Sequence, residues 1–270
     1  MPLEPLELAS ESTGTGPPLL LLHGLFGSLR NWRSIARALS QTHRVFSVDL
    51  RNHGSSPWAD SMSYPEMAED VRHLIKREQL DRPAVMGHSM GGKTAMTLAL
   101  LHPEEISRLI VVDIAPIAYA DRLSVFARGM QQVDLSTATA RDEVGRRLSS
   151  LIPEPGVVPF LLQNLVMTDG HFDWRINLAA ISAAMQTLSS FPAALQDRRF
   201  ERPVHVIAGG RSDYVADRAG SAFRPMFPSA QVDVIEQAGH WVHADQQAAF
   251  IDCMRRVLST GSPSPAAAAP

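Results

Sequence analysis

The chain has 270 residues, of which 45% are hydrophobic and 20% are charged, and its formal net charge is −3. This composition is that of a globular protein with a sizeable core, and it excludes a wholly disordered chain. The lack of any Lys/Arg-rich run argues against nucleic-acid binding, and the single cysteine, Cys253, excludes an intrachain disulfide and a cysteine metal cluster.

The first ten residues, MPLEPLELAS, contain neither a basic leader nor an apolar signal core. No apolar stretch approaches the roughly 20 residues that a membrane-spanning helix needs. We therefore expect a cytoplasmic protein that does not act in a membrane, an expectation that a removed leader would change.

Short apolar runs alternate with longer amphipathic stretches along most of the chain. The predicted strands are 19–22, 44–49, 84–86, 108–112, 204–208 and 232–235. The predicted helices are 29–39, 64–79, 90–101 and 246–258. This alternation predicts an α/β domain with a mostly parallel central sheet flanked by helices.

The alternation stops between residues 116 and 202, where we predict no strand. The predicted helices there are 122–132, 139–151, 158–165 and 174–188. Inserted between two strands, they would form a helical lid over the carboxyl ends of the strands, where open α/β sheets bind ligands. The predicted division is a core of residues 1–115 and 203–260, a lid of residues 116–202 and a disordered tail of residues 261–270.

A candidate nucleophile follows the predicted strand 84–86. Residues 87–91, Gly-His-Ser-Met-Gly, fit the pattern G-x-S-x-G and open the next predicted helix. This strand-turn-helix context is what a nucleophile elbow requires, because the turn is too tight for side chains beside the serine. We predict that Ser89 is exposed above the sheet as the nucleophile of an acyl transfer.

Acyl transfer needs two donors for the oxygen that becomes negative, and backbone N–H groups fixed in advance provide them. Met90 N–H, directly after the nucleophile, is one candidate. The other is expected in His23-Gly24-Leu25-Phe26-Gly27-Ser28, after the strand 19–22. We assign it to Leu25, with Phe26 as the alternative.

A general base is expected in Ala238-Gly239-His240-Trp241-Val242-His243, between the last predicted strand and the last helix. A histidine there can reach Ser89, and its place after the serine in the chain suits this fold. We assign the base to His240, because Gly239 precedes it, with His243 as the rival. His23, His53 and His88 are expected to orient loops.

The motifs HGLFGS, DLRNHGSS, GHSMGG, VVDIAP and AGHWVHA occur in this order. Together they resemble those of the small bacterial esterases of the YbfF type and of related mitochondrial abhydrolase-domain proteins, over roughly residues 19–258. The resemblance implies hydrolysis of carboxylic esters with short or medium acyl chains, without a metal or organic cofactor. It places Ser89, His240, Asp113, Leu25 and Met90 on the family's functional positions.

The acid that orients His240 has two candidates. Asp213 follows the strand 204–208, which is the usual place for the acid in this fold. Alternatively, Ser212 occupies that place, and the acid is Asp113, directly after the strand 108–112. The second arrangement matches the resembling family, so we predict Asp113, with Asp213 as the alternative.

Large apolar side chains recur at helical spacing in the predicted lid, and some are expected to form an acyl pocket. The predicted substrate-binding residues are Phe26, Phe126, Met130, Phe160, Trp174, Met185 and Trp241. The alternative for each lid residue is that it only packs the lid against the core.

The function predicted from these residues is hydrolysis of a small-molecule ester through an acyl-enzyme. Other serine-dependent reactions of the same fold remain open: those of a thioesterase, lactonase, C–C hydrolase or perhydrolase. A binding protein that keeps the pocket without turnover is a further alternative. The oligomeric state does not follow from the sequence.

Overall fold

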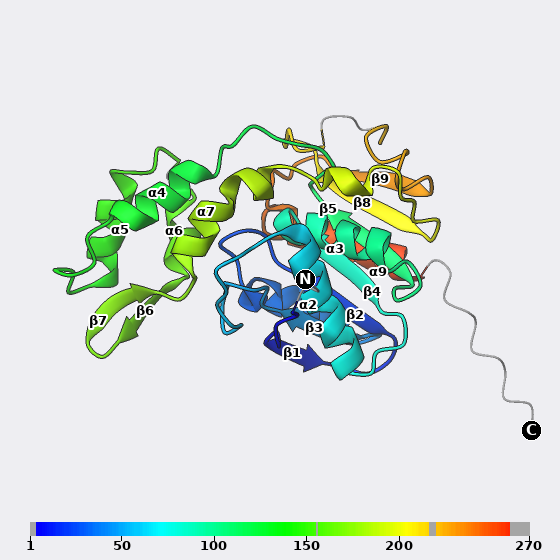
Figure 1. Cartoon of the computed structure of the whole chain (residues 1–270), viewed down its shortest axis with the longest axis horizontal. Helices are drawn as coiled ribbons and strands as arrows, with labels where there is room; N and C mark the ends of the chain where they lie inside the picture. The colour runs from blue at the N-terminus through cyan, green and yellow to red at the C-terminus, as the bar shows by residue number, and fades with distance from the viewer. Residues whose placement is uncertain (1–3, 155, 216–219, 260–270) are drawn as a thin grey trace, which may run out of the picture.

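A computed structural model describes residues 4–154, 156–215 and 220–259 of the chain. Within them the central sheet has seven strands in the order β1-β3-β2-β4-β5-β8-β9 (Figure 1). They are β1 (Ser10–Thr13), β2 (Pro18–Leu22), β3 (Arg44–Val48), β4 (Ala84–His88), β5 (Arg108–Val112), β8 (Val204–Gly209) and β9 (Ala230–Ile235). All neighbours pair in parallel except β1, which runs antiparallel to β3.

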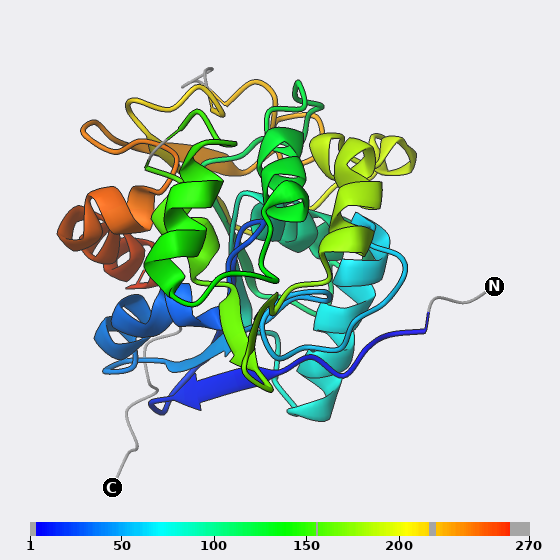
Figure 2. The ribbon, with the colours of Figure 1, turned by 90° about the vertical axis from the view of Figure 1, so that its left-hand side faces the viewer.

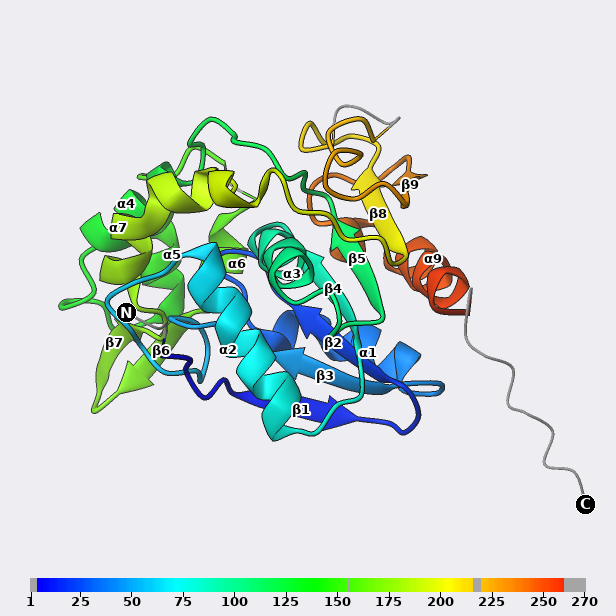
Figure 3. The same cartoon turned by 45° about the vertical axis from the view of Figure 1, so that its right-hand side comes forward.

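Helices cover both faces of this sheet (Figure 3). The 3-10 turn η1 (Leu29–Trp32) leads into α1 (Arg33–Leu39), which packs with α9 (Gln247–Ser259) on one face; α2 (Tyr64–Arg77) and α3 (Met90–Leu101) pack on the other. Because successive strand residues point to opposite faces, Leu19 and Leu21 pack on the face of α1 and α9, and Leu20 and Leu22 pack on the face of α2 and α3. Burial on both faces explains the continuous apolar runs, and the predicted fold class is confirmed.

The segment between β5 and β8 holds four helices and a hairpin. They are α4 (Ser124–Gln132), α5 (Arg141–Ser149), α6 (Val158–Leu162), β6 (Leu165–Thr168), β7 (His171–Trp174) and α7 (Leu178–Ser189), followed by the 3-10 turn η2 (Ala193–Leu195). We call residues 116–202 the insertion; it lies beside the core in Figure 1 and faces the viewer in Figure 2. The prediction of no strand there was wrong, because β6 and β7 pair antiparallel.

Two short elements of the core were also not predicted. Strand β1 has a polar sequence and is mostly exposed, so no apolar run marks it. A four-residue helix, α8 (Val242–Asp245), directly follows the loop of His240 and Trp241. The predicted tail of residues 261–270 lies outside the described residues.

None of the helices in the described ranges is both long and apolar enough to span a bilayer. The cytoplasmic location and the division into core and lid stay predictions.

Candidate active site

Ser89 lies in the turn that joins β4 to α3. Its backbone has φ 53° and ψ −116°, a region that residues other than glycine rarely adopt. A Cβ at Gly87 would lie 2.1 Å from the carbonyl oxygen of Gly91, and one at Gly91 would lie 2.5 Å from that of Leu22. Both positions therefore require glycine. The serine N–H donates to Val112 O at 3.0 Å, which ties the turn to the neighbouring strand β5.

His240 and Asp113 are hydrogen-bonded to each other. Nδ1 of His240, in the loop after β9, lies 2.8 Å from Oδ2 of Asp113, which directly follows β5. The Asp113 carboxylate is fully buried and accepts two more hydrogen bonds. The N–H of Gly209 donates to Oδ1 at 2.9 Å, and the Ser212 hydroxyl donates to Oδ2. These contacts hold the carboxylate against the imidazole.

Asp213, the alternative acid, lies elsewhere. Its side chain is 88% exposed, and its Oδ2 lies 3.9 Å from Nη1 of the exposed Arg122. The preceding residue, Ser212, is the one that reaches Asp113. The structure thus brings Asp113, not Asp213, to His240.

The loop after β2 carries the candidate oxyanion donors. Phe26 N–H is engaged, because it donates to His53 Nε2 at 3.2 Å. Within the described residues, the amides of Leu25 and Met90 have no hydrogen-bond acceptor. Met90 N–H also lies at the N-terminus of the twelve-residue helix α3, where the helix dipole favours negative charge. These contacts favour Leu25 over Phe26 as the second donor.

Two buried histidines support this loop, as expected for His23 and His53. His23 Nδ1 lies 2.8 Å from Gly24 O, and its Nε2 accepts from Leu50 N–H at 3.0 Å. His53 Nδ1 likewise lies 2.9 Å from Arg51 O. Burial lowers the pKa of His23 to about 4 and that of His53 to about 3, so both rings are neutral at pH 7.

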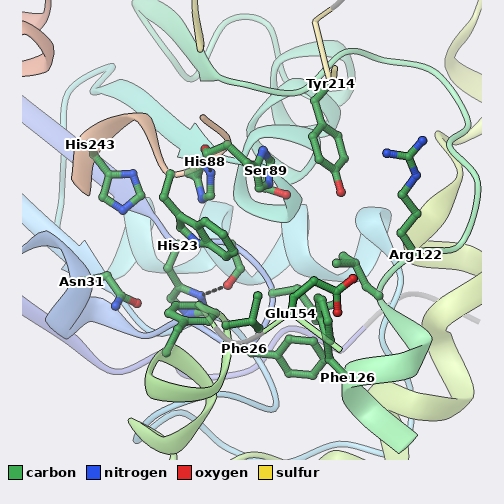
Figure 4. A pocket seen from close by; sticks show the side chains of 18 of the residues that line it. His23, Phe26, Asn31, His88, Ser89, Arg122, Phe126, Glu154, Tyr214 and His243 are labelled. Carbon is green, nitrogen blue, oxygen red and sulfur yellow. Dashed lines mark hydrogen bonds between the residues drawn. The ribbon is translucent and has the colours of Figure 1, made fainter. Parts of the chain in front are cut away.

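A cavity of about 250 Å³ opens beside Ser89 and His240. Four predicted substrate-binding residues line it: Phe26, Phe126, Phe160 and Trp241. Figure 4 shows Phe26 and Phe126 across the cavity from the Ser89 hydroxyl, with Arg122 and Glu154 at its side. The cavity therefore offers a mainly aromatic wall to a group attached to Ser89.

The other predicted substrate-binding residues lie outside this cavity. Met185 lines a smaller one, of about 40 Å³, which also touches Ser89, Leu25 and Met90. Trp174 and Met130 belong to the packing of the insertion itself, where Trp174 Nε1–H donates to Met130 O at 2.9 Å. Helical spacing marks a buried face but does not tell an inward-facing residue from one that packs within the lid.

Tyr214 was not predicted as a site residue. Its ring stacks on the His240 imidazole, with centroids 4.1 Å apart and planes at 25°. It lines the larger cavity, where Figure 4 shows it beside Ser89, and the smaller one as well.

The rival base, His243, is buried, and burial lowers its pKa to about 4. His88 Nε2–H donates to the carbonyl oxygen of His240 at 2.9 Å and so supports the loop of the base.

Comparisons with known proteins agree with this architecture. A family described as "alpha/beta hydrolase fold" matches residues 17–149. The chain is 38% identical over 268 residues to the mouse protein named sn-1-specific diacylglycerol lipase ABHD11. The matched segment covers 95% of this chain and 87% of that relative. It is 37% identical to esterase YbfF of Escherichia coli, over 90% of this chain and 93% of that protein.

The solved structure titled "Marine microorganism esterase" superposes with a TM-score of 0.90 at 37% identity, covering 93% of this chain and 99% of that one. These relatives share the fold over nearly the whole chain. The chain therefore belongs to the α/β-hydrolase family, among the esterases of the YbfF type.

Proposed function

We propose that this protein is a carboxylic-ester hydrolase with Ser89, His240 and Asp113 as its catalytic triad. The observation that carries the proposal is the hydrogen bond between His240 Nδ1 and Asp113 Oδ2, at the edge of the cavity that Ser89 also lines. An acid at Nδ1 keeps the proton on that nitrogen. It leaves the lone pair of Nε2 free to accept a proton from serine.

The proposed reaction proceeds through an acyl-enzyme. His240 Nε2 takes the Ser89 proton as Oγ attacks the ester carbonyl, and the amides of Leu25 and Met90 donate to the oxyanion. The imidazolium then protonates the leaving alcohol. Water, deprotonated by His240, attacks the acyl-enzyme, and collapse of the second oxyanion releases the acid and regenerates Ser89.

We propose that the insertion acts as a lid and sets the acyl preference. Phe126 and Phe160 come from the insertion, whereas Phe26 and Trp241 come from the core, so both parts of the chain form the aromatic wall of the cavity. A half-open, mainly apolar cavity of this size suits a short or medium acyl chain on a small-molecule ester. The name of the mouse relative makes a diacylglycerol worth testing as well.

The alternatives share the same nucleophile and base. A thioesterase, lactonase, C–C hydrolase or perhydrolase would use Ser89 in the same way and differ in the acyl group or acceptor. No contact among the described residues favours one of these over ester hydrolysis. A binding protein without turnover has no use for the strained Ser89 backbone or for the amides of Leu25 and Met90, which have no acceptor among the described residues.

Steady-state hydrolysis of p-nitrophenyl esters with acyl chains from acetyl to dodecanoyl tests the proposal. We expect turnover by the natural chain and none above background by Ser89→Ala. Thioesters and lactones of matched chain length, run beside the series, distinguish the alternatives. Absence of turnover on every ester, by a protein that unfolds cooperatively, would contradict the proposed function.

A further inference from the structure

Lys93 is a buried lysine that the proposed reaction does not use. It lies on α3 one turn after Ser89, and its backbone N–H donates to Ser89 O at 3.0 Å. The residue is only 1% exposed, and it forms no ion pair with a carboxylate within the described ranges. A buried charge without a partner is costly, so its surroundings must compensate by other contacts.

Those contacts come from the end of the insertion. Lys93 Nζ donates to Ser189 O at 3.1 Å and to Ser190 O at 2.7 Å. These carbonyls end α7, and the last carbonyls of a helix have no partner within the helix and carry the negative end of its dipole. The protonated amine thus supplies hydrogen-bond donors to these carbonyls and a positive charge beside the negative end of the helix dipole.

Aromatic side chains complete the surroundings of the amine. Nζ lies 4.9 Å from the centroid of the Tyr119 ring and 5.7 Å from that of Tyr64. The Tyr64 hydroxyl, from α2, donates to Leu188 O at 2.6 Å. The Tyr119 N–H donates to Ser189 O at 2.9 Å. Three successive carbonyls at the end of α7 therefore receive donors from α2, from α3 and from the segment that enters the insertion.

The donors remain in either protonation state of the amine. Burial lowers the pKa of Lys93 to about 7. The neutral amine still has two N–H groups, enough for both carbonyls. A purely apolar side chain of the same length would fill the space but remove the donor to Ser190 O and leave Ser189 O with the Tyr119 N–H alone, at the cost of a buried unsatisfied carbonyl.

We propose that Lys93 is a positioning residue that fixes the insertion to the helix of the nucleophile. Its hydrogen bonds hold the connection at Ser189–Ser190, and Tyr119 of the other connection is tied to the same place by its own hydrogen bond to Ser189 O and by its ring over Nζ. Phe126 and Phe160 are then held over the serine at a set distance. The expected effect on substrates rests on the proposed esterase function; the structural effect does not.

Hydrogen exchange tests the structural effect directly, with Lys93→Met as the variant and Lys76→Met as the matched control. Lys76 is a 55% exposed lysine on α2 whose ion pair with Glu105 spans 3.6 Å. In Lys93→Met we expect amides in residues 116–123 and 185–192 to exchange at least about tenfold faster, while those of β4 stay unchanged. Unchanged exchange at these connections would overturn the inference.

Ester hydrolysis gives the second readout. Because Phe126 and Phe160 of the insertion line the cavity, we expect a hexanoyl group to contact the insertion more than an acetyl group does. We expect kcat/KM of Lys93→Met to fall at least about fivefold more on p-nitrophenyl hexanoate than on the acetate, mainly through KM. Equal losses on both esters would mean that Lys93 acts on the serine itself and would refute the positioning role.

Tyr64→Phe keeps the inference testable if Lys93→Met does not fold. It removes one hydroxyl and one hydrogen bond to Leu188 O, with little change in packing. Faster exchange confined to residues 185–192 would support the inference. Unchanged exchange in these residues would overturn it. Failure of the esterase proposal is recognised separately, because Ser89→Ala would then retain the activity of the natural chain while the exchange data stand.

Discussion

Nδ1 of His240 lies 2.8 Å from Oδ2 of Asp113, although 127 positions separate the two residues in the chain. Ser212 donates to the same carboxylate oxygen from the place where this fold usually carries its acid. The carboxylate at His240 thus follows β5, and a hydroxyl occupies the place after β8.

Replacing Asp113 by asparagine tests this arrangement. The amide fills the same space but can present an N–H to His240 Nδ1, which favours the wrong imidazole tautomer. We expect kcat to fall by at least about 10²-fold; the corresponding change in a serine protease costs roughly 10⁴. Steady-state kinetics on p-nitrophenyl butyrate provide the measurement.

Asp213→Asn is the matched control. Its kcat should fall less than about threefold, because that side chain is exposed. The reverse ranking, at similar melting temperatures, would move the acid to Asp213.

Ser89→Ala should abolish turnover without unfolding the protein. Removing the nucleophile leaves only the contribution of the oxyanion donors and binding, so we expect a loss of at least about 10³-fold. Ser149, an exposed serine at the end of α5, provides the control Ser149→Ala with unchanged activity. Ordinary turnover by purified Ser89→Ala protein, at an unchanged melting temperature, would remove the serine from the mechanism.

Phe126→Ala should change the acyl preference. The ring is buried and lines the cavity from the insertion, so its loss enlarges the acyl pocket and weakens contacts with longer chains. We expect kcat/KM to fall about threefold to tenfold on the hexanoyl ester and less than about twofold on the acetyl ester. Phe172→Ala, on β7 and outside the cavity lining, is the control. A natural enzyme that strongly prefers acetyl over butyryl and hexanoyl esters would contradict the apolar acyl pocket.

His23 and His53 should make the protein sensitive to acid. In the unfolded chain both titrate near 6.5, whereas in the fold their pKa values are about 4 and about 3. Below about pH 6.5 the unfolded state therefore binds protons first, and the free energy of unfolding falls as the pH falls. The neutral histidines make their full contribution to the free energy of unfolding above about pH 6.5. By pH 4, the part of that contribution lost through His23 alone is about 3 kcal/mol.

Urea unfolding at pH 7.5 and pH 5 measures this effect. We expect the free energy of unfolding to be at least about 2 kcal/mol lower at pH 5. His53→Gln keeps an acceptor for Phe26 N–H but does not titrate, so its difference between the two pH values should be smaller. A natural chain with equal stability at both pH values, or a variant with the same pH dependence, would count against two neutral histidines under the oxyanion loop.

Some parts of the fold follow directly from local patterns. Strand β5 has the predicted bounds, Arg108–Val112, because a run of apolar residues ends at a charged one on either side. The hairpin β6–β7 was missed, although its turn carries the Asp-Gly pair that hairpins favour. Asp169 and Gly170 have φ of 50° and 83°. The predicted helices 158–165 and 174–188 include only the outer ends of the hairpin, Leu165 and Trp174, and no element is predicted for residues 166–173.

The site was predictable to the extent that its residues lie in local motifs. Ser89 and the loop of His240 stand at strand ends with diagnostic glycines, and the resemblance supplied Asp113. The stacking of Tyr214 on His240 and the contact of Lys93 with Ser190, 97 positions later, depend on tertiary packing. No spacing along the chain indicates them.

The register of β4 and β5 fixes where Ser89 and Asp113 lie relative to each other. His88 pairs with Val112 across the two strands, so Ser89 and Asp113 directly follow adjacent strands. The spacing between the proposed nucleophile and the proposed acid is therefore set by the ladder of the sheet. The loop after β8 contributes the Ser212 hydroxyl and the Tyr214 ring to the site instead of a carboxylate. A change in the length of that loop would move these two side chains but would leave Asp113 in register with Ser89.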